Sequence, residues 1–336
     1  MIQQQQPLVV TAYLWEGAQA LQQACAGIDG LTLRFVHDDD ALVAATTHSE
    51  VLILSDACYS AALAGALQAP DSRVRWLQFS SAGFNRALAH GVPVDVIMTN
   101  ASPAFASTVA EHAMALLLAL VRMIPASDRQ RDEPTWRRDI LLARLDSLEG
   151  QTLAVVGYGA IGRAVAQRAK GFGMRVEVVG RTPPAPGGDV DASHPLSQLH
   201  AVLARADAVV LAVALNDSTH HLIDRSALRY MQAHARLVNV ARGAVVDEQA
   251  LIAALNEGVI AAAGLDVFAQ EPLPGDSPLR QMSNVVMTPH IGGFGGARVH
   301  ARLAALLSDN LRRYLHGDEL LHQARQRQPG SMASPA

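Results

Sequence analysis

Residues 153–181 read LAVVGYGAIGRAVAQRAKGFGMRVEVVGR, and this stretch decides the fold. An apolar run, Leu153–Val156, leads into three glycines with the spacing Gly157-x-Gly159-x-x-Gly162. An amphipathic helical pattern follows the glycines, and a second apolar run closes the stretch. This order of strand, glycine turn, helix and strand predicts a βαβ unit with two parallel strands.

Each glycine in this turn has a physical role. The first permits the tight turn, the second lets the backbone approach a pyrophosphate, and the third lets helix and strand pack closely. The helix N-terminus also presents free N–H groups to phosphates. A plain tight turn is the alternative, but the flanking strand and helix favour a dinucleotide. The residues expected to contact it here are Gly157, Tyr158, Gly159, Ala160, Ile161 and Gly162.

The end of the second strand predicts which dinucleotide is preferred. Sites that prefer NAD place a carboxylate there, where it binds the ribose 2′-hydroxyl. This chain instead has Gly180, Arg181 and Thr182, so nothing repels a 2′-phosphate and the guanidinium offers a planar donor for one. We therefore predict a preference for NADPH, with NAD as the alternative cofactor and an ordinary surface loop as the alternative interpretation of Arg181.

Short apolar runs recur along the whole chain, and each is typical of a strand buried on both faces. The first series is Leu8–Leu14, Leu31–Val36, Val51–Leu54, Val74–Phe79 and Val94–Thr99. The second series is Thr152–Val156, Arg175–Val179, Ala208–Val213, Leu237–Val240, Ala262–Asp266 and Val285–Thr288. Long helical patterns cover Ala104–Ile124 and Ala297–Leu315, and a polar tail, Arg325–Ala336, is expected to fray. The pattern predicts an α/β fold with two Rossmann-like or flavodoxin-like domains, each with a parallel sheet.

Composition excludes several classes of protein. The 336 residues suffice for two domains, and the net charge of −4 provides no basic field for nucleic acid or an acidic membrane. Cys25 and Cys58 are interpreted as buried thiols in a reducing compartment rather than as a disulfide framework. The N-terminus shows no secretory signal, and the longest apolar stretch, Ala113–Val121, is too short to span a bilayer. A cytoplasmic location is expected.

Three polar residues each follow a predicted strand, namely Arg242, Glu271 and His290. Ligands of open α/β sheets bind at the carboxyl ends of the strands. Reduction of a 2-oxoacid needs a cation for the carboxylate and carbonyl, and a proton donor whose pKa lies near neutrality. Arginine and histidine suit those tasks, and a carboxylate beside the histidine would orient its ring. Taken singly, each of the three also has a purely structural interpretation. Arg242 could be a helix-cap donor, Glu271 a loop carboxylate and His290 a turn residue.

These segments closely resemble the D-isomer-specific 2-hydroxyacid dehydrogenases over nearly the whole chain. The matching stretches are VVGYGAIG, NVARGAVVDEQALIAAL, GLDVFAQEPLP, TPHIGG, LQFSSAGFN and TNASPAFASTVAEHAMALLLAL. The resemblance implies that Arg242 binds substrate, that Glu271 orients the histidine and that His290 is the acid/base. It further implies a substrate-carboxylate loop at Ser81, Ala82 and Gly83. The cofactor contacts that it implies beyond the glycine turn are Arg181, Thr182, Val240, Ala241, Asp266 and Gly292.

The resemblance also implies a domain organisation. A discontinuous substrate domain, 1–101 plus 293–336, would carry an inserted NAD(P)-binding Rossmann domain, 102–292. The helix within TNASPAFASTVAEHAMALLLAL would pack at the interface of a homodimer. Trp136 lies where related reductases can reach across the dimer toward the substrate. Domain closure over bound substrate would exclude water.

The expected activity is reduction of a small 2-oxoacid, of the glyoxylate or hydroxypyruvate type, to a D-2-hydroxyacid with NADPH. The pair Gly180–Arg181 is also what the family's NADPH-using glyoxylate and hydroxypyruvate reductases have at this position. An NAD-linked dehydrogenase acting on another 2-hydroxyacid is the alternative enzyme. A nucleotide-sensing corepressor is the alternative from another class, which the set of arginine, glutamate and histidine disfavours. No metal is expected, because hydride transfer needs none, and His37–Asp40 is interpreted as a helix N-terminus.

Overall fold

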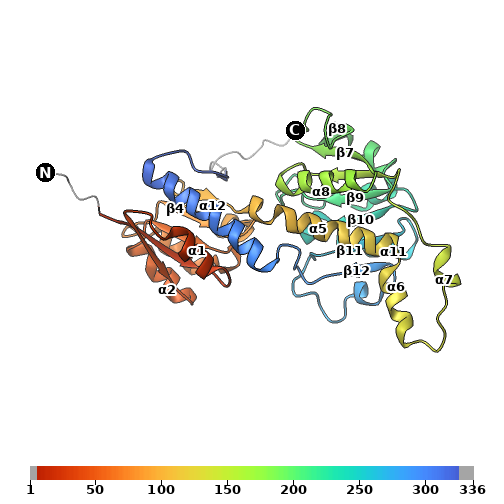
Figure 1. Ribbon diagram of the computed structural model, residues 1–336, viewed down its shortest axis with the longest axis horizontal. Helices are drawn as coiled ribbons and strands as arrows, with labels where there is room; N and C mark the ends of the chain where they lie inside the picture. Colours follow the sequence, from red (N-terminus) through yellow and green to blue (C-terminus); the bar gives the residue numbers. More distant parts are fainter. Residues whose placement is uncertain (1–5, 325–336) are drawn as a thin grey trace. The chain divides into compact units, whose positions relative to one another are not determined.

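The computed structural model describes residues 6–324 of the chain. The chain divides into two compact units, the first formed by Met1–Phe105 with Gly295–Ala336 and the second by Ala106–Phe294. Each described unit is a parallel β-sheet covered by helices on both faces (Figure 1). The predicted α/β class with two parallel sheets is confirmed.

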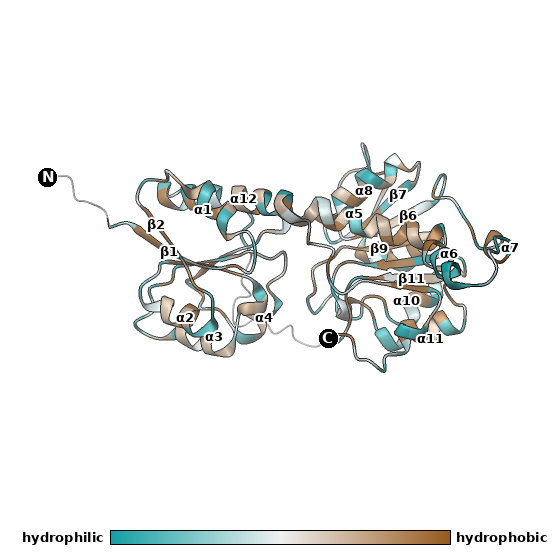
Figure 2. Ribbon diagram, turned by 60° about the horizontal axis from the view of Figure 1, so that its bottom comes forward, coloured by the Kyte–Doolittle hydropathy of each residue, from teal (hydrophilic) through white to brown (hydrophobic). Residues whose placement is uncertain are grey.

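The first unit has a five-stranded sheet in the order β2-β1-β3-β4-β5, in which every neighbouring pair is parallel. Its strands are β1 (Leu8–Tyr13), β2 (Leu31–Phe35), β3 (Val51–Leu54), β4 (Trp76–Phe79) and β5 (Ile97–Thr99). Its helices are α1 (Ala18–Cys25), α2 (Asp39–Ala44), α3 (Ala61–Gln68), α4 (Asn85–His90) and α12 (Gly296–His316). Helices α1 and α12 lie on one face of the sheet, and α2, α3 and α4 lie on the other (Figure 2).

Hydrophobic burial on both faces explains this arrangement. All four residues of β3 are buried, as expected for a central strand of a parallel sheet. Leu303, Leu307 and Leu311 recur at helical spacing on α12 and bury against the α1 side. Asp38 accepts the N–H of Ala41 at 2.7 Å and so caps α2, in agreement with the prediction of a helix N-terminus.

The second unit has a seven-stranded parallel sheet in the order β12-β11-β10-β9-β6-β7-β8. Its strands are β6 (Thr152–Val156), β7 (Arg175–Gly180), β8 (Ala192–Pro195), β9 (Ala208–Leu211), β10 (Arg236–Asn239), β11 (Ala262–Leu265) and β12 (Val285–Met287). Its helices are α6 (Ile124–Arg129), α7 (Asp139–Leu142), α8 (Ala160–Gly171), α9 (Leu199–Leu203), α10 (Arg225–Tyr230) and α11 (Glu248–Asn256). The 3₁₀ turns of the two units are Ala45–Thr47, Asp56–Cys58, Gln130–Asp132, Leu196–Gln198, Gly243–Val245 and Pro278–Gln281.

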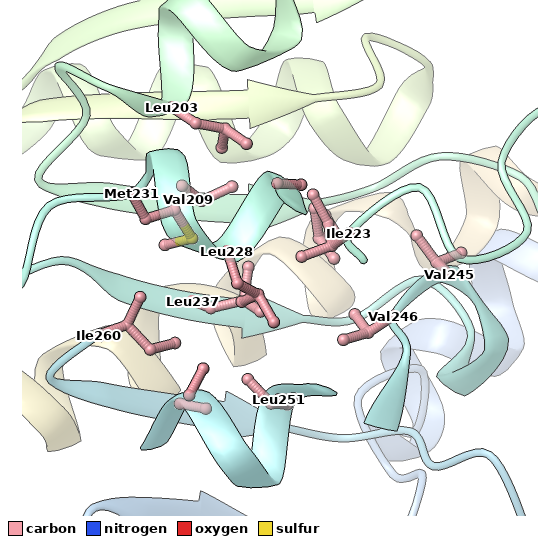
Figure 3. Packing of buried hydrophobic residues seen from close by; sticks show 14 of the residues in the cluster. Leu203, Val209, Ile223, Leu228, Met231, Leu237, Val245, Val246, Leu251 and Ile260 are labelled. Carbon is pink, nitrogen blue, oxygen red and sulfur yellow. The ribbon is translucent and has the colours of Figure 1, made fainter. Parts of the chain in front are cut away.

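The strand order of the second unit reverses between β6 and β9, because the chain builds β6, β7 and β8 outward to one side and β9 to β12 outward to the other. Ligands of open α/β sheets bind at such a switch point. The core on one face is an apolar layer that joins the strands to α9, α10 and α11, with Leu228, Leu237 and Leu251 at its centre (Figure 3). This layer holds the loops at the carboxyl ends of the strands in place.

Helix α5 (Ser102–Val121) begins at the boundary between the units and continues through the second. Its length and apolar composition would allow it to cross a membrane, but half of its most apolar stretch is buried in the protein. A Cβ added to Gly264 on β11 would lie 3.0 Å from Leu116 Cβ, so helix and strand are in close contact here. We therefore interpret α5 as a core helix.

Some boundaries differ from those predicted. The helix ends at Val121 rather than near Ile124, because Met123 adopts a left-handed conformation (φ 53°) and a new helix starts with Pro125 in its first turn. Strand β8 was not predicted, since Ala192–Pro195 lacks apolar alternation and lies at the sheet edge. The two cysteines are free and buried, as expected. The predicted fraying tail, Arg325–Ala336, lies outside the described residues.

Candidate active site

The predicted polar residues of the second unit lie beyond three adjacent strands. Arg242 follows β10, Glu271 follows β11 and His290 follows β12, and β11 pairs with both of its neighbours in parallel register. The carboxyl ends of parallel strands meet at one edge, so the three loops start side by side. The glycine turn follows β6 at the same edge of the same sheet.

Glu271 and His290 form the polar centre of this edge. The Nδ1 atom of His290 lies 2.7 Å from Glu271 Oε2, and the other carboxylate oxygen accepts the N–H of Phe268 at 3.0 Å. Burial raises the pKa of Glu271, but the hydrogen bonds from His290 and Phe268, together with the charges of His290 and Arg242, outweigh burial and lower that pKa. The side chain is therefore a carboxylate at neutral pH, which orients the imidazole so that Nε2 remains for other chemistry.

The Arg242 loop is supported by a buried asparagine. Asn239 donates from Nδ2 to the carbonyl of Arg242 at 2.9 Å and accepts the N–H of Ala241 at 3.0 Å. Arg242 itself donates from Nη1 to the carbonyl of Ala241 at 2.7 Å. A Cβ added to Gly243 would lie 1.9 Å from the carbonyl of Phe268, so only glycine permits the contact between this loop and the Glu271 loop. These contacts keep a guanidinium close enough to stabilise the Glu271 carboxylate.

Asp266, which the sequence suggested as a cofactor contact, lies at the end of β11 and is 3% exposed. Its carboxylate accepts the N–H groups of Ile291 and Gly292, each at 2.9 Å. A Cβ added to Gly292 would lie 2.8 Å from the same carboxylate, which explains a glycine at that position. Two residues predicted to touch a cofactor thus also bond to each other.

The glycine turn has the shape that a dinucleotide needs. Gly157 adopts a positive φ of 99°, and a Cβ there would lie 2.7 Å from the backbone of Ala212. A Cβ on Gly162 would lie 1.9 Å from the carbonyl of Gly157, so the third glycine allows helix and strand to pack. A Cβ on Gly159 would meet nothing within 4 Å. The backbone is therefore open at the second glycine, where a pyrophosphate would approach at the start of α8.

The remaining predicted cofactor residues lie on the same edge. Arg181 and Thr182 follow β7, the strand next to β6, and both are exposed. Val240 and Ala241 follow β10 and are buried. The guanidinium of Arg163, on α8, lies 5.8 Å from the centre of the ring of Tyr158 in the glycine turn. A cationic rim is thus present near the turn, and the 180–183 segment contains no carboxylate to oppose it.

The predicted substrate loop, Ser81–Gly83, lies in the first unit beyond β4. The Ser81 hydroxyl donates to the carbonyl of Gly83 at 2.7 Å and accepts the N–H of Asp56 at 3.2 Å, so it stabilises the loop itself. Among the described residues, the amides of Ala82 and Gly83 donate to no protein acceptor. Two adjacent free N–H groups are suited to a carboxylate.

His112 and Thr288, at the edge of the second unit, are polar side chains that the sequence analysis did not assign to the site. His112, on α5, lies with Nε2 2.7 Å from the Thr288 hydroxyl and 3.3 Å from Asp266 Oδ1. The contact joins residues 176 positions apart, so no local pattern indicates it. Trp136, which was singled out in the sequence, is 77% exposed on the segment between α6 and α7.

Comparison with known proteins decides the family. The model of the D-isomer specific 2-hydroxyacid dehydrogenase NAD binding domain matches residues 114–292, more than half of the chain. The chain belongs to this family. It is therefore an NAD(P)-dependent oxidoreductase, and the resemblance stated from the sequence motifs is confirmed.

Relatives of this dehydrogenase agree with that assignment. The chain is 40% identical to the glyoxylate/hydroxypyruvate reductase B of Enterobacter sp. (strain 638) over 66% of its own length and 69% of that protein. It is 38% identical to the glyoxylate reductase of Korarchaeum cryptofilum (strain OPF8), over 66% and 67% of the two chains. A D-isomer specific 2-hydroxyacid dehydrogenase from Xanthobacter autotrophicus Py2, solved with NADPH and MES, superposes with a TM-score of 0.78 at 28% identity, covering 95% of this chain and 99% of that one.

Proposed function

We propose that this dehydrogenase reduces small 2-oxoacids of the glyoxylate or hydroxypyruvate type to D-2-hydroxyacids. The observation that carries the proposal is the 2.7 Å pair of His290 and Glu271, on the sheet edge that also bears Arg242 and the glycine turn. The names of the two reductases reported above support the same class of substrate.

The proposed roles follow from the chemistry of each group. Arg242 binds the substrate carboxylate and polarises the carbonyl, because a guanidinium presents parallel donors to paired oxygens. His290 donates a proton to the carbonyl oxygen as negative charge develops there, and Glu271 holds its ring. In the first unit, the amides of Ala82 and Gly83 are the proposed donors of the carboxylate-binding loop that the family resemblance implies. When bound, the reduced nicotinamide would supply the hydride.

The residues that would hold the cofactor fit it. The open backbone at Gly159 and the first turn of α8 would receive the pyrophosphate, and Arg181 and Thr182 would contact the ribose side. Val240, Ala241, Asp266 and Gly292 remain proposed contacts further along the edge. The substrate domain is proposed as 1–101 plus 293–336, and the cofactor domain as 102–292.

A direct assay tests the proposed reaction. Glyoxylate, hydroxypyruvate, phenylpyruvate and pyruvate are supplied separately to the full-length protein with NADPH or NADH, and absorbance at ~340 nm is followed. Loss of absorbance with glyoxylate and with hydroxypyruvate is the expected result. Chiral chromatography should show the D-isomer of the hydroxyacid formed from hydroxypyruvate, since glycolate, the product from glyoxylate, is achiral. No turnover with any of the acids would contradict the proposal, and a preference for phenylpyruvate would contradict the substrate class.

We further propose that the enzyme prefers NADPH and that Arg181 provides the preference. Replacing Arg181 with alanine removes a charge-assisted bond worth about 1.5–3 kcal/mol, so kcat/KM with NADPH should fall about tenfold to a hundredfold. The value with NADH should change less than about twofold, because NADH has no 2′-phosphate. Steady-state kinetics with both cofactors measure the effect.

The matched control is Arg229→Ala, which removes an exposed arginine in the last turn of α10. It should leave both kcat/KM values unchanged. Equal values for NADPH and NADH in the natural enzyme would overturn the preference. An Arg181→Ala variant with undiminished use of NADPH would overturn the role of the arginine.

We also propose a homodimer, supported by apolar side chains along the segment around α7. This segment extends away from the sheet of its unit (Figure 1), and its exposed residues include Trp136, Ile140 and Leu142, each more than half accessible. Light scattering should give about twice the chain mass of 35.7 kDa. The double variant Ile140→Asp, Leu142→Asp should dissociate, whereas Val94→Asp, at an exposed apolar site of the first unit, should not. A monomeric natural protein would contradict this proposal.

A further inference from the structure

The backbone of His290 is held in an uncommon conformation. Its φ of 54° places a non-glycine residue in the left-handed region, at a cost of about 1–2 kcal/mol. Such a conformation persists only where surrounding contacts stabilise it. The contact with Glu271 acts on the ring, so the stabilisation of the backbone comes from elsewhere.

Asp266 supplies much of that stabilisation. Its backbone carbonyl accepts the N–H of His290 at 2.8 Å, while its carboxylate accepts the next two amides, those of Ile291 and Gly292. Three consecutive N–H groups therefore donate to one buried residue. The His290 turn is fixed relative to β11 rather than only to its own strand, β12.

Thr288 connects this carboxylate to α5. Its hydroxyl lies 2.6 Å from Asp266 Oδ1 and 2.7 Å from His112 Nε2. A hydroxyl has a single proton, and the carboxylate accepts it. The histidine must therefore donate to the hydroxyl oxygen, which places a proton on Nε2 of His112. The result is a directed chain of donors from His112 to Thr288 to Asp266.

His112 is itself anchored. It lies one helical turn before Leu116, whose Cβ would be 3.0 Å from a Cβ on Gly264 of β11. A Cβ on Gly292 would lie 3.2 Å from His112 Cδ2, so the imidazole ring also packs against the backbone of the turn at Gly292. The imidazole is about four-fifths buried. It both donates to the turn and limits the space into which the turn could move.

We propose that His112 is a positioning residue for His290, and that it acts through Thr288 and Asp266. The chain of hydrogen bonds fixes the turn 288–292 and thereby the direction from which the His290 ring meets Glu271. The kinetic consequence rests on the function proposed above, since it assumes that His290 donates the proton.

The kinetic test compares two replacements of His112. His112→Leu removes the donor at similar size, and kcat should fall about tenfold to a hundredfold, as for other residues that orient a reacting group. KM for glyoxylate should change less than kcat, because the replacement alters the direction of the His290 ring rather than the guanidinium proposed to bind the carboxylate. His112→Gln restores an N–H near the same place and should recover most of kcat. Glu111→Gln, at the adjacent position of α5, is the matched control.

A second pair of variants, at Thr288, tests the same chain of hydrogen bonds. Thr288→Val should lower kcat as His112→Leu does, and Thr288→Ser should restore it. The double variant His112→Leu, Thr288→Val should be no slower than His112→Leu alone, because the histidine also lies 3.3 Å from Asp266 and its loss removes both routes to that carboxylate. Additive losses would overturn the proposal. This pair also serves if His112→Leu fails to fold.

A readout without cofactor or substrate separates this inference from the proposed function. Amide hydrogen exchange of Ile291 and Gly292 in the free protein should be at least about tenfold faster in His112→Leu and near normal in His112→Gln. That result stands even if no 2-oxoacid is reduced, which would overturn only the proposed function. Unchanged exchange, or a loss of kcat that glutamine does not rescue, would overturn the positioning role.

Discussion

Replacing His290 with asparagine is expected to lower kcat for glyoxylate reduction by about 10²–10⁴-fold, the usual contribution of a general acid. Asparagine is chosen because it tolerates the left-handed backbone found at this residue, so the turn should keep its shape. The proton donor is lost, while the glycine turn and Arg242 are untouched. Stopped-flow kinetics at saturating NADPH, with fluorescence titration of the cofactor, measure the two effects separately.

Glu271→Gln is the companion variant. Glutamine retains an oxygen for the His290 Nδ1–H but removes the negative charge that faces it. A smaller loss of kcat, about tenfold to a hundredfold, is expected for a residue that orients the acid. If His290→Asn kept activity within about threefold of the natural enzyme, His290 could not be the acid. A parallel loss of NADPH affinity would instead indicate a role in binding.

The sheet edge that carries these residues could be predicted from the sequence, because the pattern that marks it lies within a few residues of each strand. Each of Arg242, Glu271 and His290 follows a short apolar run, and parallel strands bring their carboxyl ends to one edge. The glycine turn is local at Gly162, whose contact with the carbonyl of Gly157 lies within one βαβ unit, whereas Gly157 is also constrained by the backbone of Ala212 beyond β9. Hydrophobic periodicity and residue spacing are enough to predict structural features that depend on residues close together in the sequence.

Features that depend on distant contacts could not be predicted in this way. Strand β8 forms because β7 offers an open edge, and its own residues show no strand pattern. The end of α5 depends on the backbone of Met123, which no sequence motif marked. His112 bonds to Thr288, which lies 176 positions later in the sequence, so the polar residues near the start of an otherwise apolar helix gave no indication of this partner. The carboxylate of Asp266 has partners that only the folded turn creates.

Replacing Arg242 with alanine is expected to lower kcat/KM for glyoxylate by about 10²–10³-fold, the range found when one donor that stabilises a developing oxyanion is removed. Both kcat and KM should be affected, because the proposed guanidinium contacts the carboxylate in the ground state and polarises the carbonyl in the transition state. Arg242→Lys should recover only part of the loss, since an ammonium lacks the paired donors. Steady-state kinetics of the natural enzyme, Arg242→Lys and Arg242→Ala should give kcat/KM values that fall in that order.

Two further measurements show whether the loss arises at the substrate. Glycolaldehyde has a reducible carbonyl but no carboxylate, so the ratio of glyoxylate to glycolaldehyde turnover should fall in Arg242→Ala, and free guanidinium should partly restore glyoxylate reduction. The charge of Arg242 helps to lower the pKa of Glu271, so its removal raises that pKa. As the pH falls, Glu271 should therefore take up a proton at a higher pH in Arg242→Ala than in the natural enzyme, and the variant should lose further activity there. An Arg242→Ala enzyme that loses glyoxylate and glycolaldehyde turnover equally would contradict carboxylate binding. In that case the guanidinium would act on the pair of Glu271 and His290 instead.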